Sequence, residues 1–143
     1  MKYFIIILLT VTFSNTKTCN NKNASTAKNI ETSIQEAKNM YYINTLNGKD
    51  VVKEKLYITF DEERNLISGY SGCNTFSSKY TIVNDQISLG FPIASKIYCE
   101  EKMVLEQGFF KALLEIKTKT ITGKVLSLKD TNGNELLSGI RKD

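Results

Sequence analysis

The sequence predicts an α+β fold in which about eight short antiparallel strands form a curled sheet, with one helix at about residues 100–116 packed against it. Two observations support this prediction. From residue 40 onward, short segments alternate apolar and polar residues as half-buried strands do, and turn residues separate them. One late segment then changes to the apolar period of a helix.

The strands before the helix follow from local patterns. Lys55–Phe60 alternates, residues 61–65 form a polar turn, and Leu66–Tyr70 is a second short strand. Asn84-Asp85 tolerates positive φ and separates two apolar stretches, so residues 80–89 are predicted to be a hairpin. In chain order, the predicted strands before the helix are 40–43, 55–60, 66–70, 80–83 and 86–89, with a turn at Asn47-Gly48. Pro92 opens a further segment over residues 93–98.

Residues 100–116 form the predicted helix. Glu100 and Glu101 fall in its first turn, where the helix dipole favours carboxylates. Its apolar residues share one helix face, which we expect to be buried against the sheet: Leu105, Phe109, Ala112, Leu113 and Ile116. Three further strands are predicted after the helix, over residues 118–121, 125–128 and 135–140.

Residues 1–18 are predicted to be a signal peptide. Met1-Lys2 is a short positive start, and Tyr3–Phe13 is an apolar run of the length found in signal peptides. Because a bilayer span needs about 20 apolar residues, this run is too short to cross a membrane. We therefore expect the protein to be exported, either as a membrane-anchored lipoprotein or as a periplasmic or secreted protein.

Cys19 is predicted to be lipidated, because it closely follows the apolar run and precedes a polar stretch, as in a bacterial lipoprotein. Lys17 departs from the usual lipobox, and two alternatives stay open: a soluble product that starts near Asn15, and an uncleaved anchor. Residues 19–38 contain few large apolar side chains, so they are predicted to be a flexible tether. Residues 39–143 are predicted to be one folded domain.

The composition argues against several classes of function. The net charge is +4 and the lysines are spread along the chain, so no nucleic-acid partner is expected. The chain has no histidine, which removes Ser-His catalysis. Cys73 and Cys99 cannot by themselves supply the four ligands of a zinc site. No cofactor is predicted. The protein is expected to be a monomer that binds an unknown protein partner in the envelope.

Cys73 and Cys99 are the candidate disulfide pair. An exported protein enters an oxidising compartment, and the pair would close a loop of about 26 residues, which stabilises the fold by about 3.5 kcal/mol in a chain-entropy calculation. This pairing leaves Cys19 as the odd cysteine, which lipidation or signal removal explains. Free buried thiols and a redox pair are the alternatives.

The other candidate residues have simpler structural explanations. Gly69, Gly72 and Asn74 are expected to mark a bend or bulge that needs positive φ. The carboxylates are expected to be solvated in turns or on a helix face: Asp61, Glu62, Glu63, Glu106, Glu115 and Asp130. The tyrosines are expected to be strand residues with solvated hydroxyls, with a stacking platform as the alternative: Tyr41, Tyr42, Tyr57, Tyr70, Tyr80 and Tyr98.

Several ordered motifs resemble the META domain family, which includes the HslJ-like heat-shock lipoproteins. The motifs are Leu46-Asn47-Gly48, the run Ser-Gly-Tyr-Ser-Gly-Cys-Asn-Thr-Phe at 68–76, Tyr80-Thr81, Ile93-Ala94-Ser95 with Cys99, the set Glu106, Phe109 and Leu113, and Leu126–Gly133. The resemblance covers about residues 40–140. Tyr41 or Tyr42 stands where the family usually has Trp, and Ser95 stands where it usually has Thr.

The resemblance implies a conical antiparallel sheet packed on one helix, and an envelope or secreted protein without established catalytic residues. We therefore expect a non-enzymatic, exported cell-envelope protein, an accessory lipoprotein in stress tolerance or secretion. One alternative is a pilotin-like adaptor that binds a partner peptide. The other is a secreted hydrolase that uses carboxylates alone, which would need two close carboxylates in a deep cleft.

Overall fold

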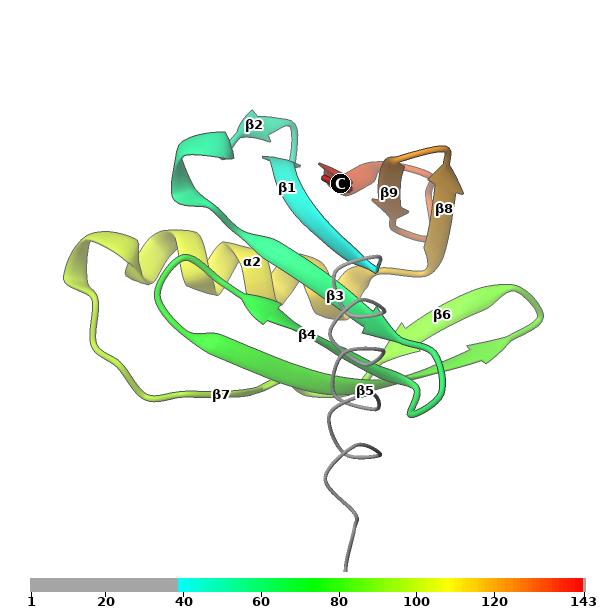
Figure 1. Ribbon diagram of the computed structural model, residues 1–143, viewed down its shortest axis with the longest axis horizontal. Coiled ribbons are helices and arrows are strands. Elements are labelled where there is room, and N and C mark those ends of the chain that lie inside the picture. The colour runs from blue at the N-terminus through cyan, green and yellow to red at the C-terminus, as the bar shows by residue number, and fades with distance from the viewer. Residues whose placement is uncertain (1–38, 143) are drawn as a thin grey trace, which may run out of the picture.

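The computed structural model describes residues 39–142 of the chain (Figure 1). The predicted signal peptide at 1–18, the predicted tether at 19–38 and Cys19 lie outside the described residues.

An antiparallel sheet and one α-helix make up the described part of the chain, which confirms the α+β prediction. The helix α2 spans Met103–Glu115, and a 3-10 turn at Glu100–Lys102 precedes it. A second 3-10 turn lies at Val52–Glu54. The ten strands are β1 (Met40–Leu46), β2 (Lys49–Asp50), β3 (Tyr57–Asp61), β4 (Leu66–Tyr70), β5 (Thr75–Val83), β6 (Gln86–Leu89), β7 (Ile93–Ala94), β8 (Thr118–Thr122), β9 (Val125–Lys129) and β10 (Glu135–Ile140).

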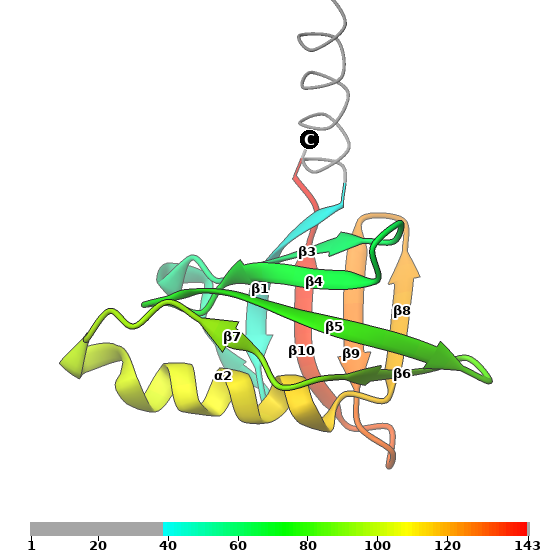
Figure 2. The same cartoon turned by 90° about the horizontal axis from the view of Figure 1, so that it is seen from below.

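The strand order is β6-β5-β4-β3-β1-β10-β9-β8, with β2 paired to β1 and β7 paired to β5. The C-terminal strand β10 therefore returns to pair with the first strand, and α2 lies along one face of the sheet (Figure 2). One backbone hydrogen bond, from Ile87 N to Lys117 O at 2.9 Å, joins β6 to the residue before β8. The sheet is not closed, and its conical shape stays a prediction.

Two tight turns have the backbone that the sequence predicts. Asn84 and Asp85 have φ of 50° and 62°, as the type I′ turn of a two-residue hairpin requires, and they join β5 to β6. Asn47 and Gly48 have φ of 50° and 74°. The second turn lets Lys49–Asp50 fold back on β1 as a further short strand, which the sequence pattern did not predict.

The core lies between the sheet and α2. Phe109, Leu113 and Ile116 are fully buried, as predicted, whereas Leu105 is only half-buried and packs at the margin of the core. The Phe109 ring packs edge-on against Phe76 from β5, with ring centroids 5.4 Å apart. The buried side of the helix is therefore predicted correctly over its C-terminal two turns.

The helix predicted at about residues 100–116 is present, as a 3-10 turn over 100–102 followed by the α-helix from Met103. In the segment 93–98 that precedes it, only Ile93–Ala94 form a strand. Beyond it, the backbone of Ile97 bonds to the side chain of Asn74, which draws the segment away from β5.

Candidate functional site

A disulfide ties the β4–β5 connection to the start of the helical region. Cys73 and Cys99 are bonded, with Cα atoms 6.0 Å apart, inside the range that disulfides adopt. Cys73 follows β4, and Cys99 immediately precedes the 3-10 turn that leads into α2. The bond closes a sequence separation of 26 residues and fixes both ends of the intervening segment.

Asn74 is the centre of a hydrogen-bond network beside this disulfide. Its side-chain oxygen accepts from Ser95 Oγ at 2.7 Å and from Ile97 N at 2.8 Å. Its side-chain nitrogen donates to Ile97 O at 3.2 Å and to both oxygens of the Glu106 carboxylate at 3.0 Å. One amide therefore holds the segment before Cys99 and the first turn of α2 together.

Ser71 and Glu106 complete this network. The Ser71 hydroxyl accepts from Asn74 N at 3.1 Å, and its single proton faces the Asn74 carbonyl and the Glu106 carboxylate. Ser71 is fully buried, so its hydroxyl is not available to a substrate. Glu106 was expected to be solvated, and this expectation is wrong: the side chain is half-buried and accepts bonds from two residues of the β4–β5 connection. We call Ser71, Asn74, Ser95 and Glu106 the Asn74 network.

Gly72 has φ of +100°, as expected for a bend that needs glycine. A Cβ there would lie 2.9 Å from Leu105 and 3.1 Å from Leu56, so a side chain has no room either. The expectation of positive φ does not hold for Gly69 or Asn74. At Gly69 the reason for glycine is close approach, because a Cβ would lie 2.0 Å from the Tyr57 carbonyl oxygen.

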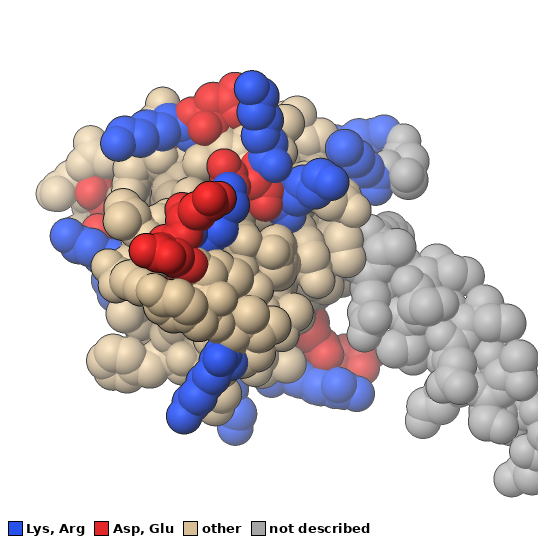
Figure 3. All heavy atoms as spheres, turned by 90° about the vertical axis from the view of Figure 1, so that its left-hand side faces the viewer, with Lys and Arg blue, Asp and Glu red and all other residues tan. Residues whose placement is uncertain are grey.

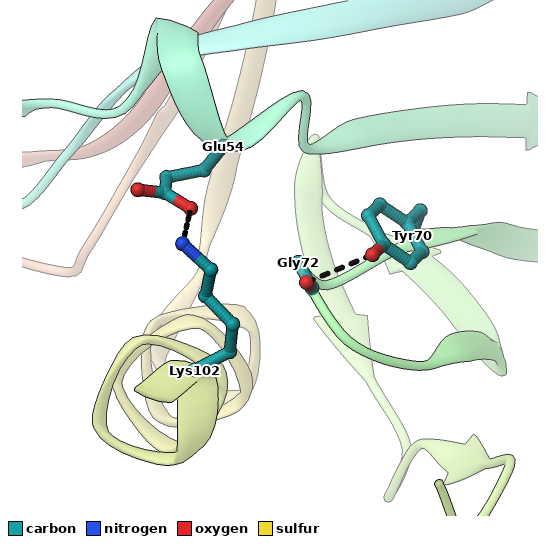
Figure 4. Close-up of polar contacts among 4 residues, drawn as sticks. All are labelled: Glu54, Tyr70, Gly72 and Lys102. Carbon is teal, nitrogen blue, oxygen red and sulfur yellow. Dashed lines mark hydrogen bonds and ion pairs between the residues drawn. The ribbon is translucent and has the colours of Figure 1, made fainter. Parts of the chain in front are cut away.

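Two polar contacts flank this bend (Figure 4). Tyr70 OH donates to Gly72 O at 2.8 Å, and Lys102 Nζ lies 2.6 Å from Glu54 Oε2. The hydrogen bond to Glu54 raises the pKa of the Lys102 ammonium. This ion pair links the 3-10 turn before α2 to the 3-10 turn after β2.

The six candidate carboxylates lie at three separate places: the β3–β4 turn, α2 and the β9–β10 turn. Asp61 accepts from Arg64 N at 2.9 Å, and Glu62 lies 3.3 Å from Lys119 Nζ. In the β9–β10 turn, hydrogen bonds led by the Asn134 side chain lower the pKa of Asp130. Asp61 and Asp130 therefore cap turns, and the six carboxylates are not gathered at one place, as a hydrolase that uses carboxylates alone would need.

The tyrosines divide into three groups. Tyr41 and Tyr80 are core residues, which corrects the expectation of solvated hydroxyls for these two, and burial raises the pKa of Tyr80. Tyr42, Tyr57 and Tyr70 are half-buried and lie side by side on β1, β3 and β4. Tyr98 is exposed, beside the disulfide.

Large apolar side chains are exposed around the disulfide-bonded Cys99. Ile97 is 61% exposed, Tyr98 74%, and Val104 83%, and Met103 at the first position of α2 is also exposed. We call these four residues the apolar face. Figure 3 views the molecule from the end where α2 begins and shows a broad uncharged area there, with basic and acidic side chains around it. Exposed apolar groups gathered in one region mark interaction sites more often than isolated ones do.

Other features add no chemistry to this region. Among residues 39–142, no three His, Cys, Asp or Glu side chains are placed to hold a metal ion. An open hollow of about 420 Å³ lies beside the β5–β6 hairpin, lined by hydroxyl, amide and apolar groups and by Lys117. Within the residues that the structure describes, no helix has the length and apolar character needed to span a bilayer.

Comparison with known families identifies the fold. A family model described as META domain matches residues 32–142, so the chain belongs to the META domain family, as its motifs predicted. None of the curated proteins compared matches the sequence. The motif residues at 71, 73, 74, 95, 99 and 106 belong to the Asn74 network or to the disulfide, so they hold the fold together.

Solved structures share this fold. A protein from Burkholderia xenovorans solved by NMR aligns with a TM-score of 0.57 and 17% identity, covering 79% of this chain and 87% of that one. A second NMR structure aligns with a TM-score of 0.54 and 23% identity, covering 74% and 90% of the two chains. The crystal structure of a DUF4847 family protein from Bacteroides vulgatus aligns with a TM-score of 0.53 and 10% identity, covering 78% and 99%. At these identities the likeness shows the fold alone.

Proposed function

We propose that this META-domain protein is a non-enzymatic accessory protein of the cell envelope, exported and anchored by a lipid on Cys19, which binds a partner protein in stress tolerance or secretion. The observation that carries the proposal is the apolar face. Its side chains are exposed, and the disulfide and the Asn74 network fix the backbone on both sides of it. A surface held in one conformation loses little entropy when it binds, which favours recognition.

The disulfide supports export. Disulfides persist in oxidising compartments and are rare in reducing ones. Cys73 and Cys99 are placed by the fold at bonding distance, and the chain contains one further cysteine, Cys19. A lipid on Cys19 would give that residue a role and leave the described domain free to reach its partner.

A pilotin-like adaptor that holds a partner peptide is the second candidate. Ile97 and Tyr98 favour it, because they project from an irregular segment beside the first turn of α2, where a short apolar peptide could lie against the helix. The two candidates differ in the size of the partner surface. An isolated peptide of the partner that competes for the apolar face would select the adaptor.

Two experiments test the proposal. The first follows the full chain in its own cells by fractionation and detergent-phase partition. We expect the protein in the envelope and the detergent phase, and we expect Cys19→Ser to release it. Recovery of the wild-type protein from the cytosol, or a mature N-terminus upstream of Cys19, would contradict the anchored form.

The second experiment places a photo-crosslinking residue at Val104 in intact cells, and at Asn132 of the β9–β10 turn as an exposed control. We expect a discrete crosslinked partner from position 104 and none from position 132. Val104→Glu should abolish a crosslink made from position 98. Equal crosslinking from positions 104 and 132 would show that the apolar face has no specific partner.

A further inference from the structure

A row of aromatic and apolar side chains crosses the face of the sheet opposite α2. Directly paired residues on neighbouring strands point to the same face. The pairs Val125 with Ile140, Ile140 with Tyr42, Tyr42 with Tyr57, and Tyr57 with Tyr70 therefore form one continuous line across β9, β10, β1, β3 and β4. We call these five residues the outer row.

The outer row lies away from the core. The neighbours of Tyr42, Tyr57 and Tyr70 along their strands, such as Tyr41, Ile58 and Gly69, are buried on the inner face with α2. Figure 2 shows α2 beneath the sheet and no described element on the opposite face of β3 and β4. The Tyr42 and Tyr57 ring centroids are 6.3 Å apart, and so are those of Tyr57 and Tyr70. With strands about 4.8 Å apart, the row extends over about 19 Å.

Hydroxyl groups border the row on both sides. Thr59, Ser68 and Ser77 pair across β3, β4 and β5 on one side, where Thr59 is buried and the two serines are half-buried. Thr45, Ser138, Ser127 and Thr120 pair across β1, β10, β9 and β8 on the other side. Charged side chains of both signs lie at the margins of these borders: Lys142 Nζ lies 4.9 Å from the Tyr42 ring centroid, Glu135 accepts a hydrogen bond from Ser127 and pairs with Lys129, Asp50 pairs with Thr45, and Lys79 pairs with Leu66.

These features restrict the ligand chemistry. Every strand in the row pairs on both sides, so its backbone groups are already bonded and cannot add a peptide strand. Single-stranded nucleic acid would need a basic groove beside the aromatic rings, whereas the hydroxyl borders here have charges of both signs at their margins. A line of tyrosine rings with apolar bodies and polar tips, bordered by groups that both donate and accept hydrogen bonds, matches a neutral ligand with flat apolar faces and a hydroxyl rim.

We propose that the outer row binds an uncharged polysaccharide strand, whose sugar rings pack on Tyr42, Tyr57 and Tyr70 while its hydroxyls bond to the bordering serines and threonines. The site uses none of the residues of the apolar face. It therefore goes beyond the proposed function, and either can fail without the other.

The test measures binding of a β-1,4-linked N-acetylglucosamine hexamer to the full chain by calorimetry and by tyrosine fluorescence, which no tryptophan obscures because the chain has none. Tyr57→Val removes a central ring and keeps a strand-forming residue, and Tyr98→Val is the matched control on the apolar face. We expect saturable binding by the wild type, at least about tenfold weaker binding by Tyr57→Val, which equals about 1.4 kcal/mol, and no change for Tyr98→Val.

Thermal unfolding checks that the variants fold, and Tyr42→Val replaces Tyr57→Val if the latter does not. Tyr57→Phe keeps the ring and should retain binding. No binding of the hexamer by the wild type overturns the proposal, and so does unchanged binding by a folded Tyr57→Val. Binding of a polygalacturonate oligomer or a proline-rich peptide in place of the hexamer also overturns it, because the ligand would then be an anion or a peptide.

Discussion

Substitution of Asn74 should be among the most damaging polar changes in this protein. Asn74→Ala removes two hydrogen bonds accepted by the amide oxygen and the donor shared by Ile97 O and Glu106. A hydrogen bond to a charged group contributes about 1.5–3 kcal/mol, and a neutral one about 1 kcal/mol. Ser95 and Ile97 are exposed and can bond to water instead, so most of the loss falls on Glu106. We expect a loss of about 3 kcal/mol, out of a typical total of about 5–15 kcal/mol.

Asn74→Asp distinguishes the bonds that the Asn74 side-chain oxygen accepts from the bonds that its nitrogen donates to Glu106. The new carboxylate keeps the bonds from Ser95 and Ile97 N, and it places a second negative charge where the amide nitrogen now lies 3.0 Å from Glu106. Two carboxylates at this separation cannot both ionise easily, so they take up one shared proton at a higher pH than isolated carboxylates do. We expect Asn74→Asp to be less stable than Asn74→Ala at pH 7 and to recover at about pH 4–5.

Urea denaturation at both pH values measures these effects, with the disulfide intact in every variant. At about 1–3 kcal/mol per molar urea, the Asn74→Ala midpoint should fall by about 1–3 M. Asn132→Ala, an exposed asparagine in the β9–β10 turn, is the control and should change the midpoint little. The network does not hold the fold as described if Asn74→Ala has the same urea midpoint as the wild type. The same conclusion follows if the loss of stability in Asn74→Asp is independent of pH.

Three further predictions concern the disulfide, the helix and one turn. The double change Cys73→Ser with Cys99→Ser should lower the free energy of unfolding by about 3.5 kcal/mol in urea, and reductant should destabilise the wild type and leave the double variant unchanged. Phe109→Ala should cost about 3–5 kcal/mol, and a variant that melts with the wild type would show that this face is not core. The lowered pKa of Asp130 stabilises the fold above its ordinary value of 3.8, and this contribution is lost as the pH falls through the lower folded-state value. Asp130→Asn should therefore flatten the acid side of the stability profile, and an unchanged slope below pH 4 would refute this assignment.

Local sequence patterns predicted the elements whose determinants are local. The β5–β6 hairpin follows from two adjacent residues that accept positive φ, and the buried face of α2 follows from its apolar period. The pairing of β10 with β1 follows from neither, because it depends on residues nearly a hundred positions apart. The outer row was out of reach for the same reason: Tyr42, Tyr57 and Tyr70 become neighbours only once the strand register is known.

Glu106 shows what the sequence could have indicated. It lies three residues before Phe109, which places it beside the buried face of the helix, where a carboxylate needs partners. The partners themselves, Ser71 and Asn74, lie more than thirty residues earlier and are brought close by the disulfide and the bend at Gly72. The helical period of a sequence can thus indicate that a polar residue lies beside the buried side of a helix. It cannot identify the residue that forms a hydrogen bond with it.

The division of roles among the residues bears on where function can be sought. One group of residues is bonded internally, by hydrogen bonds or by the disulfide: Ser71, Cys73, Asn74, Cys99 and Glu106. A substitution at any of these positions therefore changes the stability of the fold first. A loss of function in such a variant would say little about binding. Exposed Val104 and Tyr98 contribute little to the core, and the fold gains nothing from leaving large apolar groups in water. In the proposed function these side chains contact a partner protein, so polar substitutions there should change binding while the unfolding curve stays in place.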